Sequence, residues 1–149
     1  MNIEILQPKT KSDITAYLNL RWQLLRKPWN QPKGTEIDKF EDEAIKVMAK
    51  HKTKIVGVGR IHKVENNIWQ IRYMAVIPEY QGKQVGKKIL LELEYLAKRQ
   101  NAKEIFLNSR ETAVDFYKKN GYEIESEGKT LFDSIKHFKM KKIIFKDTK

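Results

Sequence analysis

The sequence of 149 residues contains no cysteine. This absence excludes a disulfide framework, a thiolate nucleophile and a zinc site with cysteine ligands, and no metal is expected. No apolar run approaches the roughly 20 residues that a membrane-spanning helix needs. Residues 1–6 also lack the basic region and long apolar stretch of a secretory signal. We therefore expect a cytoplasmic protein with no membrane partner.

Acidic side chains are in the minority, with 19 Asp and Glu against 30 Lys and Arg, giving a net charge of +11. Such a surplus is typical of proteins that bind nucleic acid, an anionic membrane or a phosphorylated cofactor. It is equally typical of lysine-rich proteins whose basic side chains are simply solvated. No nucleic-acid motif accompanies the charge, so a nucleic-acid partner is not expected. Without repeats or low-complexity linkers, residues 1–149 are predicted to form one domain.

Apolar periodicity predicts an alternation of strands and helices. Helices are expected at residues 85–98 and 111–120, and an earlier one is capped by Ser12 or Asp13 and ends before Pro28. Strands are expected at residues 3–6, 43–50, 55–64, 68–76, 105–107, 122–126 and 134–145. This order predicts an α/β chain with a mixed sheet.

Asn66 and Asn67 are suited to a two-residue hairpin turn between strands 55–64 and 68–76. With that turn, His62 is expected opposite Ile71 and Arg60 opposite Tyr73. His62 would then lie on the strand beside 68–76.

The segment between strand 68–76 and helix 85–98 has the composition of an anion-binding turn. The first amides of a helix lack intrahelical partners and carry partial positive charge. Glycines let the backbone approach a ligand closely, and lysines add charge for a pyrophosphate or 3′-phosphate. The candidate cofactor-binding residues here are Gln81, Gly82, Lys83, Gln84, Val85, Gly86 and Lys87. The turn is neither a P-loop nor a dinucleotide fingerprint, because the required spacing is missing.

Residues 74–86, Met-Ala-Val-Ile-Pro-Glu-Tyr-Gln-Gly-Lys-Gln-Val-Gly, resemble the acetyl-CoA signature of the GNAT N-acetyltransferase superfamily. That signature is a strand, then Gln/Arg-x-x-Gly-x-Gly/Ala, then a helix. Gln81 and Gly86 match it, whereas Gln84 replaces its first glycine. Residues 107–122 are similar to the later Ala-x-x-Phe-Tyr-x-x-x-Gly-Phe/Tyr segment. Residues 25–29 and 132–140 resemble a bacterial subgroup whose substrates are mostly unassigned.

The resemblance implies a mixed, mostly antiparallel sheet flanked by helices, with splayed fourth and fifth strands. It implies acetyl-CoA as co-substrate, with the pantetheine arm in the gap like an added strand. Backbone groups of residues 74–76, Met74, Ala75 and Val76, would lie along that arm. Asn108 and Arg110 would contact CoA from the start of helix 111–120, where Asn108 and Glu111 could alternatively form a capping box.

The resemblance also implies direct attack of an amine on the thioester, with Tyr117 protonating the departing thiolate. On the residues alone, Tyr117 could equally be a buried core tyrosine. The general base is open, because Gln70 replaces a Glu that some family members use. His62, Glu43 and a water chain are the candidates, with His51 and His137 weaker. A lone histidine on a strand is more often structural than catalytic.

The acceptor is expected to be a primary amine of a small molecule or peptide. An acidic cluster over residues 36–43 would favour a cationic amine if it rims the acceptor cleft, or is otherwise a solvated loop face. Two other functions remain open: a non-catalytic acyl-CoA sensor, suggested by Gln84 and the missing base, and a nucleic-acid-binding module. A homodimer is left open.

Overall fold

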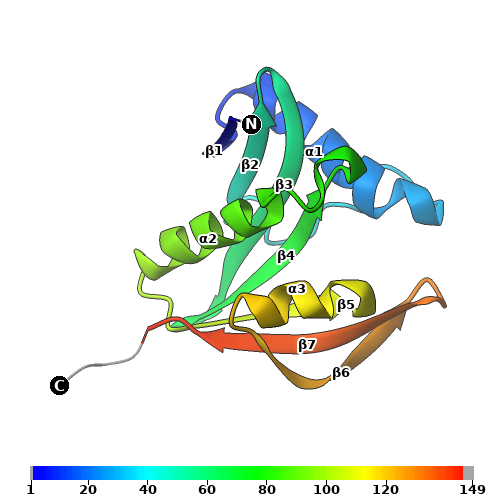
Figure 1. Ribbon diagram of the computed structural model, residues 1–149. Coiled ribbons are helices and arrows are strands. Elements are labelled where there is room, and N and C mark those ends of the chain that lie inside the picture. Colours follow the sequence, from blue (N-terminus) through cyan, green and yellow to red (C-terminus); the bar gives the residue numbers. More distant parts are fainter. Residues whose placement is uncertain (1, 146–149) are drawn as a thin grey trace.

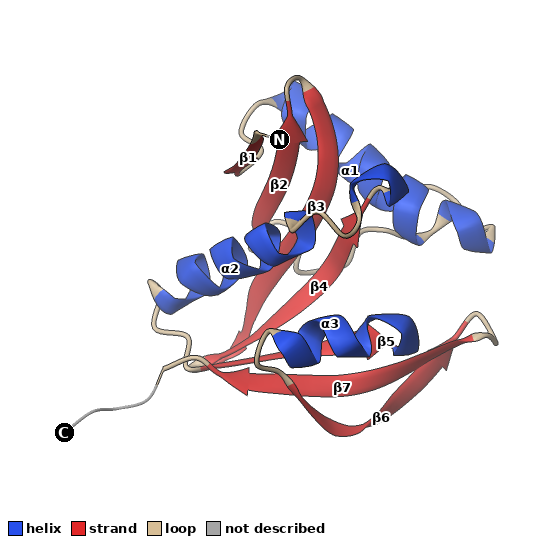
Figure 2. Ribbon diagram, viewed as in Figure 1, coloured by secondary structure: helices blue, strands red, loops and turns tan. Residues whose placement is uncertain are grey.

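The computed structural model describes residues 2–145, which form one mixed sheet with helices on both faces (Figure 1). The strand order is β1-β2-β3-β4-β5-β7-β6. The strands are β1 (Ile3–Leu6), β2 (Ile45–His51), β3 (Lys54–Glu65), β4 (Ile68–Val76), β5 (Glu104–Arg110), β6 (Glu123–Leu131) and β7 (Ile135–Ile143). The helices are α1 (Lys11–Leu25), α2 (Val85–Lys98) and α3 (Val114–Lys119), with 3₁₀ turns η1 (Lys27–Trp29), η2 (Pro78–Tyr80) and η3 (Glu111–Ala113). Figure 2 shows the same elements coloured by type.

The sheet divides between β4 and β5. These strands run parallel and pair over only four positions, from Ile68 opposite Glu104 to Ile71 opposite Leu107. Every other neighbouring pair in the described sheet is antiparallel. Beyond Ile71 the two strands diverge, as Figure 1 shows. The predicted fold class and the splayed strands are therefore confirmed.

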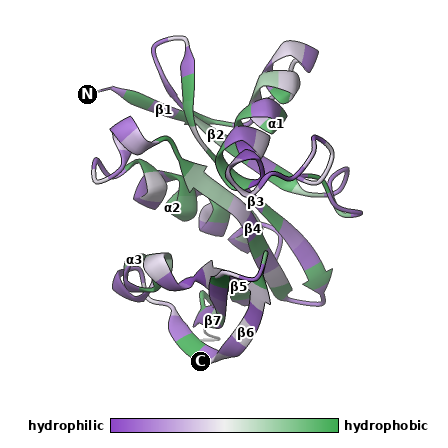
Figure 3. Cartoon of the chain, turned by 90° about the vertical axis from the view of Figure 1, so that its right-hand side faces the viewer, coloured by the Kyte–Doolittle hydropathy of each residue, from purple (hydrophilic) through white to green (hydrophobic). Residues whose placement is uncertain are grey.

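Helices α2 and α3 cover one face of the sheet and α1 covers the other (Figure 3). The apolar side of α2 is buried on β3, where Gly57 and Gly59 leave room for Ile89. On the opposite face, the Tyr17 hydroxyl of α1 donates to the carbonyl oxygen of Gly59 at 2.5 Å. The centre of β3 is thus fixed from both sides.

Two local predictions about helix starts were wrong. Helix α1 is capped by Thr10, whose side-chain oxygen accepts from the Asp13 amide at 3.0 Å, and not by Ser12 or Asp13. Asn108 and Arg110 belong to strand β5 and not to the start of a helix. The alternative role of Asn108 and Glu111, a capping box, is also absent, because neither η3 nor α3 has a side-chain cap among the described residues. Pairing of β5 with β7 continues as far as Arg110. The strand is therefore longer than the predicted residues 105–107 and includes polar residues that the sequence pattern placed at a helix start.

The predicted register between β3 and β4 was wrong by one residue. His62 lies opposite Gln70, and Arg60 lies opposite Arg72. The cause is a bulge between Lys63 and Glu65, which adds one residue to β3 next to the turn. A second irregularity lies opposite Gly59, where Tyr73 of β4 has a φ of 64°. This bulge changes the direction in which the following side chains of β4 point, at the place where the strand separates from β5.

Candidate functional site

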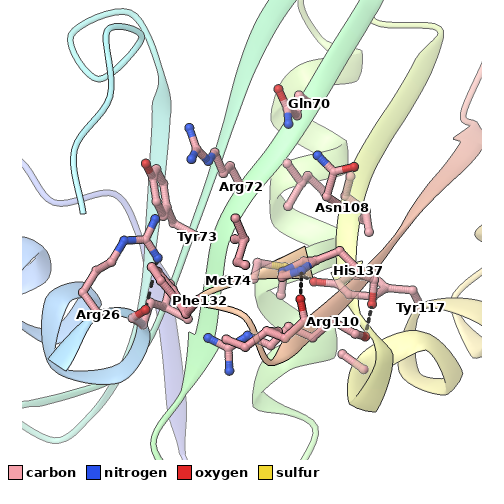
Figure 4. Close-up of a pocket in the computed structure, with 17 residues that line it drawn as sticks. Arg26, Gln70, Arg72, Tyr73, Met74, Asn108, Arg110, Tyr117, Phe132 and His137 are labelled. Carbon is pink, nitrogen blue, oxygen red and sulfur yellow. Dashed lines mark hydrogen bonds between the residues drawn. The ribbon is translucent and has the colours of Figure 1, made fainter. Parts of the chain in front are cut away.

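A cavity of about 170 Å³ opens where β4 and β5 separate. Met74 of β4, Asn108 of β5 and Tyr117 of α3 line it (Figure 4). Arg26 from the end of α1 and Phe132 from the turn between β6 and β7 close another side. The cavity thus lies at the ends of two strands whose edges have lost their partners.

The segments 25–29 and 132–140, which stood out in the sequence, meet in this wall. The rings of Trp29 and Phe132 stack with centroids 6.1 Å apart. The Arg26 guanidinium lies 5.8 Å from the centroid of Phe132. Sequence reasoning did not assign a role to Arg26 or Phe132, although the resemblance of their two segments to one subgroup was the available signal.

Tyr117 presents its hydroxyl to the gap between the strands. The hydroxyl donates to the Met74 sulfur at 3.7 Å, a weak contact, and only 8% of the residue is exposed. Burial raises the pKa of the Tyr117 phenol, although Arg110 works against this shift. Tyr117 therefore stays protonated at neutral pH and can donate to an atom placed in the gap.

The turn before α2 has the geometry of an anion site. The Gln81 side chain donates to the carbonyl of Val76 at 3.0 Å and closes the turn. Gly82 has a φ of 76°, and Gln84, the N-cap, has a φ of 69° with no side-chain cap bond. The Lys88 amide makes a helical bond to Gln84 at 3.0 Å, so the three preceding amides point out of the helix start.

The lysines of this turn, Lys83, Lys87 and Lys88, are exposed around the helix start. They add mobile positive charge to the fixed partial charge of a 14-residue helix. Gly86 allows the helix start to approach α3, because a Cβ there would lie 3.3 Å from the Phe116 ring. Helix α3 therefore links the turn to the cavity: Phe116 packs next to Gly86, and the adjacent Tyr117 lines the cavity.

His62 and Glu43 do not line the cavity. His62 is 1% exposed, and its ring stacks on Phe40 with centroids 4.3 Å apart. Arg60 donates to the His62 Nδ1 at 2.9 Å, and burial together with Arg60 lowers the pKa of His62 to about 4. Glu43 is exposed on the turn that precedes β2.

Of the candidate bases named from sequence, His137 alone lines the cavity, together with the non-basic Gln70. His137 lies on β7 opposite Arg110 of β5. Its Nδ1 is 3.0 Å from the carbonyl oxygen of Ile135, so Nδ1 carries the proton and Nε2 is left to accept one. The weaker sequence candidate thus has the better position.

The acidic cluster is only partly solvated, because Glu36 and Glu41 are buried whereas Asp42 and Glu43 are exposed. Two of its carboxylates, Asp38 and Glu41, are held by arginines, so their charge is already neutralised. Arg21 bonds to Glu41 at 2.6 Å, and the Arg60 and Arg72 guanidiniums bond to Asp38 at 2.6 and 2.7 Å. Although partial burial opposes it, Arg60 and Arg72 hold the pKa of Asp38 well below its usual range.

Residues 14–122 match the acetyltransferase (GNAT) family, and the chain therefore belongs to this family of acetyltransferases. It is 30% identical over 134 residues to the uncharacterized N-acetyltransferase YjcF of Bacillus subtilis, covering 90% of this chain and 95% of the relative.

Solved structures share the fold. A putative N-acetyltransferase from Lactobacillus plantarum superposes with a TM-score of 0.83 at 16% identity, covering 97% of this chain and all of the other. A GNAT family acetyltransferase from Elizabethkingia anophelis, with acetyl-CoA bound, superposes with a TM-score of 0.79 at 17% identity, covering 96% and 99%. Homologues of this fold bind CoA or acetyl-CoA.

Within residues 2–145, no helix is both long and apolar enough to cross a membrane. The same residues contain no group of His, Asp and Glu side chains placed to hold a metal ion.

Proposed function

We propose that this chain transfers the acetyl group of acetyl-CoA directly to a primary amine of a small molecule or peptide. One observation carries the proposal: the unpaired ends of β4 and β5 open onto a cavity that Tyr117 lines, next to the exposed start of α2. Acetyl-CoA would place its pyrophosphate on residues 81–87 and its pantetheine along Met74, Ala75 and Val76. The thioester then reaches the Tyr117 hydroxyl. Asn108 lies where it can contact the end of that arm.

In the reaction, the amine nitrogen attacks the thioester carbonyl carbon and the carbon–sulfur bond then breaks. The Tyr117 hydroxyl gives its proton to the leaving sulfur, so CoA departs as a neutral thiol. The amine must also lose a proton, and we assign its acceptance to His137 Nε2 and not to His62. Gln70 lines the same cavity but cannot accept a proton.

Acetyl-CoA binding is the first test. Calorimetry should show saturable binding at micromolar to millimolar concentration, and absence of both heat and thermal shift at millimolar acetyl-CoA would rule the proposal out. Release of CoA thiol with an amine panel then tests turnover. Binding without thiol release from any amine would support a non-catalytic acyl-CoA sensor instead.

Tyr117→Phe tests the assigned acid. We expect kcat to fall by about 10²-fold or more, the usual range for loss of a general acid, while acetyl-CoA affinity stays within about twofold. The hydroxyl bonds only weakly to Met74, so stability should change little. Tyr95→Phe, at an exposed position of α2, is the matched control and should retain full activity. Equal kcat for the two variants would remove Tyr117 from the mechanism.

His137→Gln tests the assigned base. We expect lower kcat/KM at neutral pH and a smaller loss at high pH, where more acceptor is already neutral. His62→Gln should leave the shape of the pH–rate profile unchanged, because that ring does not reach the cavity. The reverse pattern would return the role to His62.

A further inference from the structure

Two arginines line the cavity without a carboxylate bonded to either one. Arg26 comes from the end of α1 and Arg110 from the end of β5, so they reach the cavity from different parts of the chain (Figure 4). Arg72, the third arginine of the lining, is already paired with Asp38 at 2.7 Å. The cavity thus holds two positive charges that no acidic residue neutralises by direct contact within residues 2–145.

Arg26 is held in a fixed orientation by neutral groups. Its Nε donates to the Thr35 carbonyl at 3.0 Å and its Nη1 to the Leu25 carbonyl at 3.1 Å. Its guanidinium lies 5.5 Å from the Tyr73 ring centroid and 5.8 Å from that of Phe132. A guanidinium stacked between rings and bonded to carbonyls keeps its charge available for an anion.

Arg110 is half-buried, and the structure over residues 2–145 gives its side chain no hydrogen bond and no ion pair. Burial and the charge of Arg26 lower the pKa of Arg110, whereas Tyr117 raises it. Burial also lowers the pKa of Arg26, with Arg72 adding to this effect and Tyr73 and Glu36 opposing it. Two like charges in one partly desolvated cavity repel each other until an anion enters.

The cofactor phosphates do not account for this pair. Side chains alternate along a strand, and Leu107 of β5 belongs to the core packed under α2. Arg110, three positions later on an unbroken ladder with β7, therefore points to the face opposite α2. The phosphate turn at residues 81–87 lies on the α2 side of the sheet.

We infer that the acceptor is an amine that also carries an anionic group, a carboxylate or a phosphate, held by Arg26 and Arg110. Its amino group then faces Met74 and Tyr117, where the thioester ends. This inference rests on the proposed acetyl transfer and specifies its substrate class. It replaces the cationic acceptor that the acidic cluster suggested, and it moves Arg110 from cofactor binding to acceptor binding.

The test measures acceptor binding to the protein saturated with CoA, which occupies the cofactor site without allowing turnover. Glycine, β-alanine and 4-aminobutyrate are compared with their amides, and O-phosphoethanolamine with ethanolamine. We expect at least one anionic amine to bind tenfold or more tightly than its neutral counterpart, and the arm that responds identifies carboxylate or phosphate. Equal binding within every pair, or no binding by any anionic amine, overturns the inference.

Charge-removing variants locate the anion. Arg110→Gln leaves no hydrogen bond unmade, so it should fold normally while weakening binding of the anionic amine at least tenfold. Arg26→Gln should act in the same direction, and both should leave binding of the neutral counterpart within twofold. Arg99→Gln, at an exposed position after α2, is the matched control and should change nothing. Tight anion binding that survives both variants would place the anion elsewhere.

Acetyl-CoA titration of the same variants separates this inference from the proposed function. Unchanged acetyl-CoA affinity in Arg110→Gln supports the acceptor role, whereas a tenfold loss with unaltered amine binding would return Arg110 to the cofactor. If the unmodified protein does not bind acetyl-CoA at all, acetyl transfer fails, and the amine comparison is run on the free protein as a test of the anion site alone.

Discussion

Gln84 occupies a backbone conformation that favours glycine. Its φ of 69° is in the left-handed region, and its side chain makes no cap bond to compensate. An L-residue in this region costs roughly 1–2 kcal/mol. Gln84 therefore adopts a conformation that a glycine would adopt without strain, and we expect its presence to affect stability more than the geometry of the turn.

Gln84→Gly should stabilise the protein by about 0.5 kcal/mol, because relief of the left-handed conformation exceeds the added freedom of the unfolded chain. Acetyl-CoA affinity should be equal or better. Urea unfolding and calorimetry measure the two effects. Gln23→Gly, at an exposed position in the last turn of α1, is the matched control and should destabilise. Destabilisation by Gln84→Gly would show that its side chain makes a contact important for the turn.

His62 shows how a buried residue can look catalytic in sequence. Its Nδ1 accepts from Arg60, so Nε2 carries the proton, and Nε2 has no partner among the described residues. The ring is surrounded by Arg60, Arg72, Asp38 and Glu41, whose charges act on it. Neutral His62 thus has a structural role: with Arg60 it packs against Asp38 and Phe40 and helps to hold the loop of residues 27–44 on the sheet.

His62 should make stability depend on pH. Its pKa is about 4 in the folded chain and 6.5 in its ordinary state, so between these values the unfolded chain binds the proton more readily. Stability should be fully present above about pH 6.5 and fall by up to about 3 kcal/mol towards pH 4. Urea unfolding at pH 7.5, 5.5 and 4.5 measures this slope. His62→Gln should flatten it and His51→Gln should not; equal slopes would contradict the assignment.

At the scale of elements, α2 and β3 pack closely because β3 has glycines under the helix. A Cβ at Gly59 would lie 2.6 Å from a methyl of Ile89 and 3.0 Å from one of Leu93. Fully buried side chains cannot move aside without disturbing the core. This contact therefore positions the start of α2, next to the turn that we propose to bind the cofactor phosphates.

Gly59→Ala should destabilise the protein by about 1–3 kcal/mol through overpacking. It should also weaken acetyl-CoA binding, because α2 must shift to accommodate the methyl group. Thermal unfolding and calorimetry report the two effects. Gly86→Ala is the milder comparison, since its new methyl would first meet the Phe116 ring edge at 3.3 Å. Full stability in Gly59→Ala would mean that the helix is held elsewhere.

Local signals in the sequence predicted some elements well and others poorly. The amphipathic pattern of α2 and the turn before it depend only on residues that are close in sequence, and the sequence predicted both elements correctly. The register of β3 on β4 depends on a bulge at residue 64 that no local pattern marks. The end of β5 was missed because the polar residues Asn108, Ser109 and Arg110 follow the apolar run of residues 105–107, so that hydrophobicity no longer marks the strand.

On the scale of the whole molecule, the sheet consists of two parts joined by few strand pairings. Strands β1 to β4 form one part, and strands β5, β7 and β6 form the other. Only four positions of β4 pair with β5. Contacts that cross the gap, such as Trp29 on Phe132, are distant in sequence and could not be predicted from it. The ion pairs of Arg21 with Glu41 and of Arg60 with Asp38 do not cross the gap, but they also join residues that are distant in sequence and could not be predicted from it.

Acetyl-CoA should stabilise the molecule by joining these two parts. At a ligand concentration of 100 times Kd, the free energy of unfolding should rise by about 2.7 kcal/mol. Hydrogen exchange should slow along β4 beyond Ile71 and along the end of β5, and change little in β1. Free adenosine 3′,5′-bisphosphate, which lacks the pantetheine arm, is the control and should not protect the strand ends. Uniform protection of all strands would argue against binding in the gap.

The contact between Trp29 and Phe132 has a consequence for how this protein diversifies. One wall of the cavity between β4 and β5 is made by two short segments that are far apart in sequence, whereas the turn proposed to bind the cofactor phosphates lies on a third segment. If the proposed acceptor site is right, substitutions in these two segments can change the preferred amine while leaving cofactor use intact. In a lineage that acquires a new acceptor, we expect positions 25–29 and 132–137 to change together, as a heritable pair.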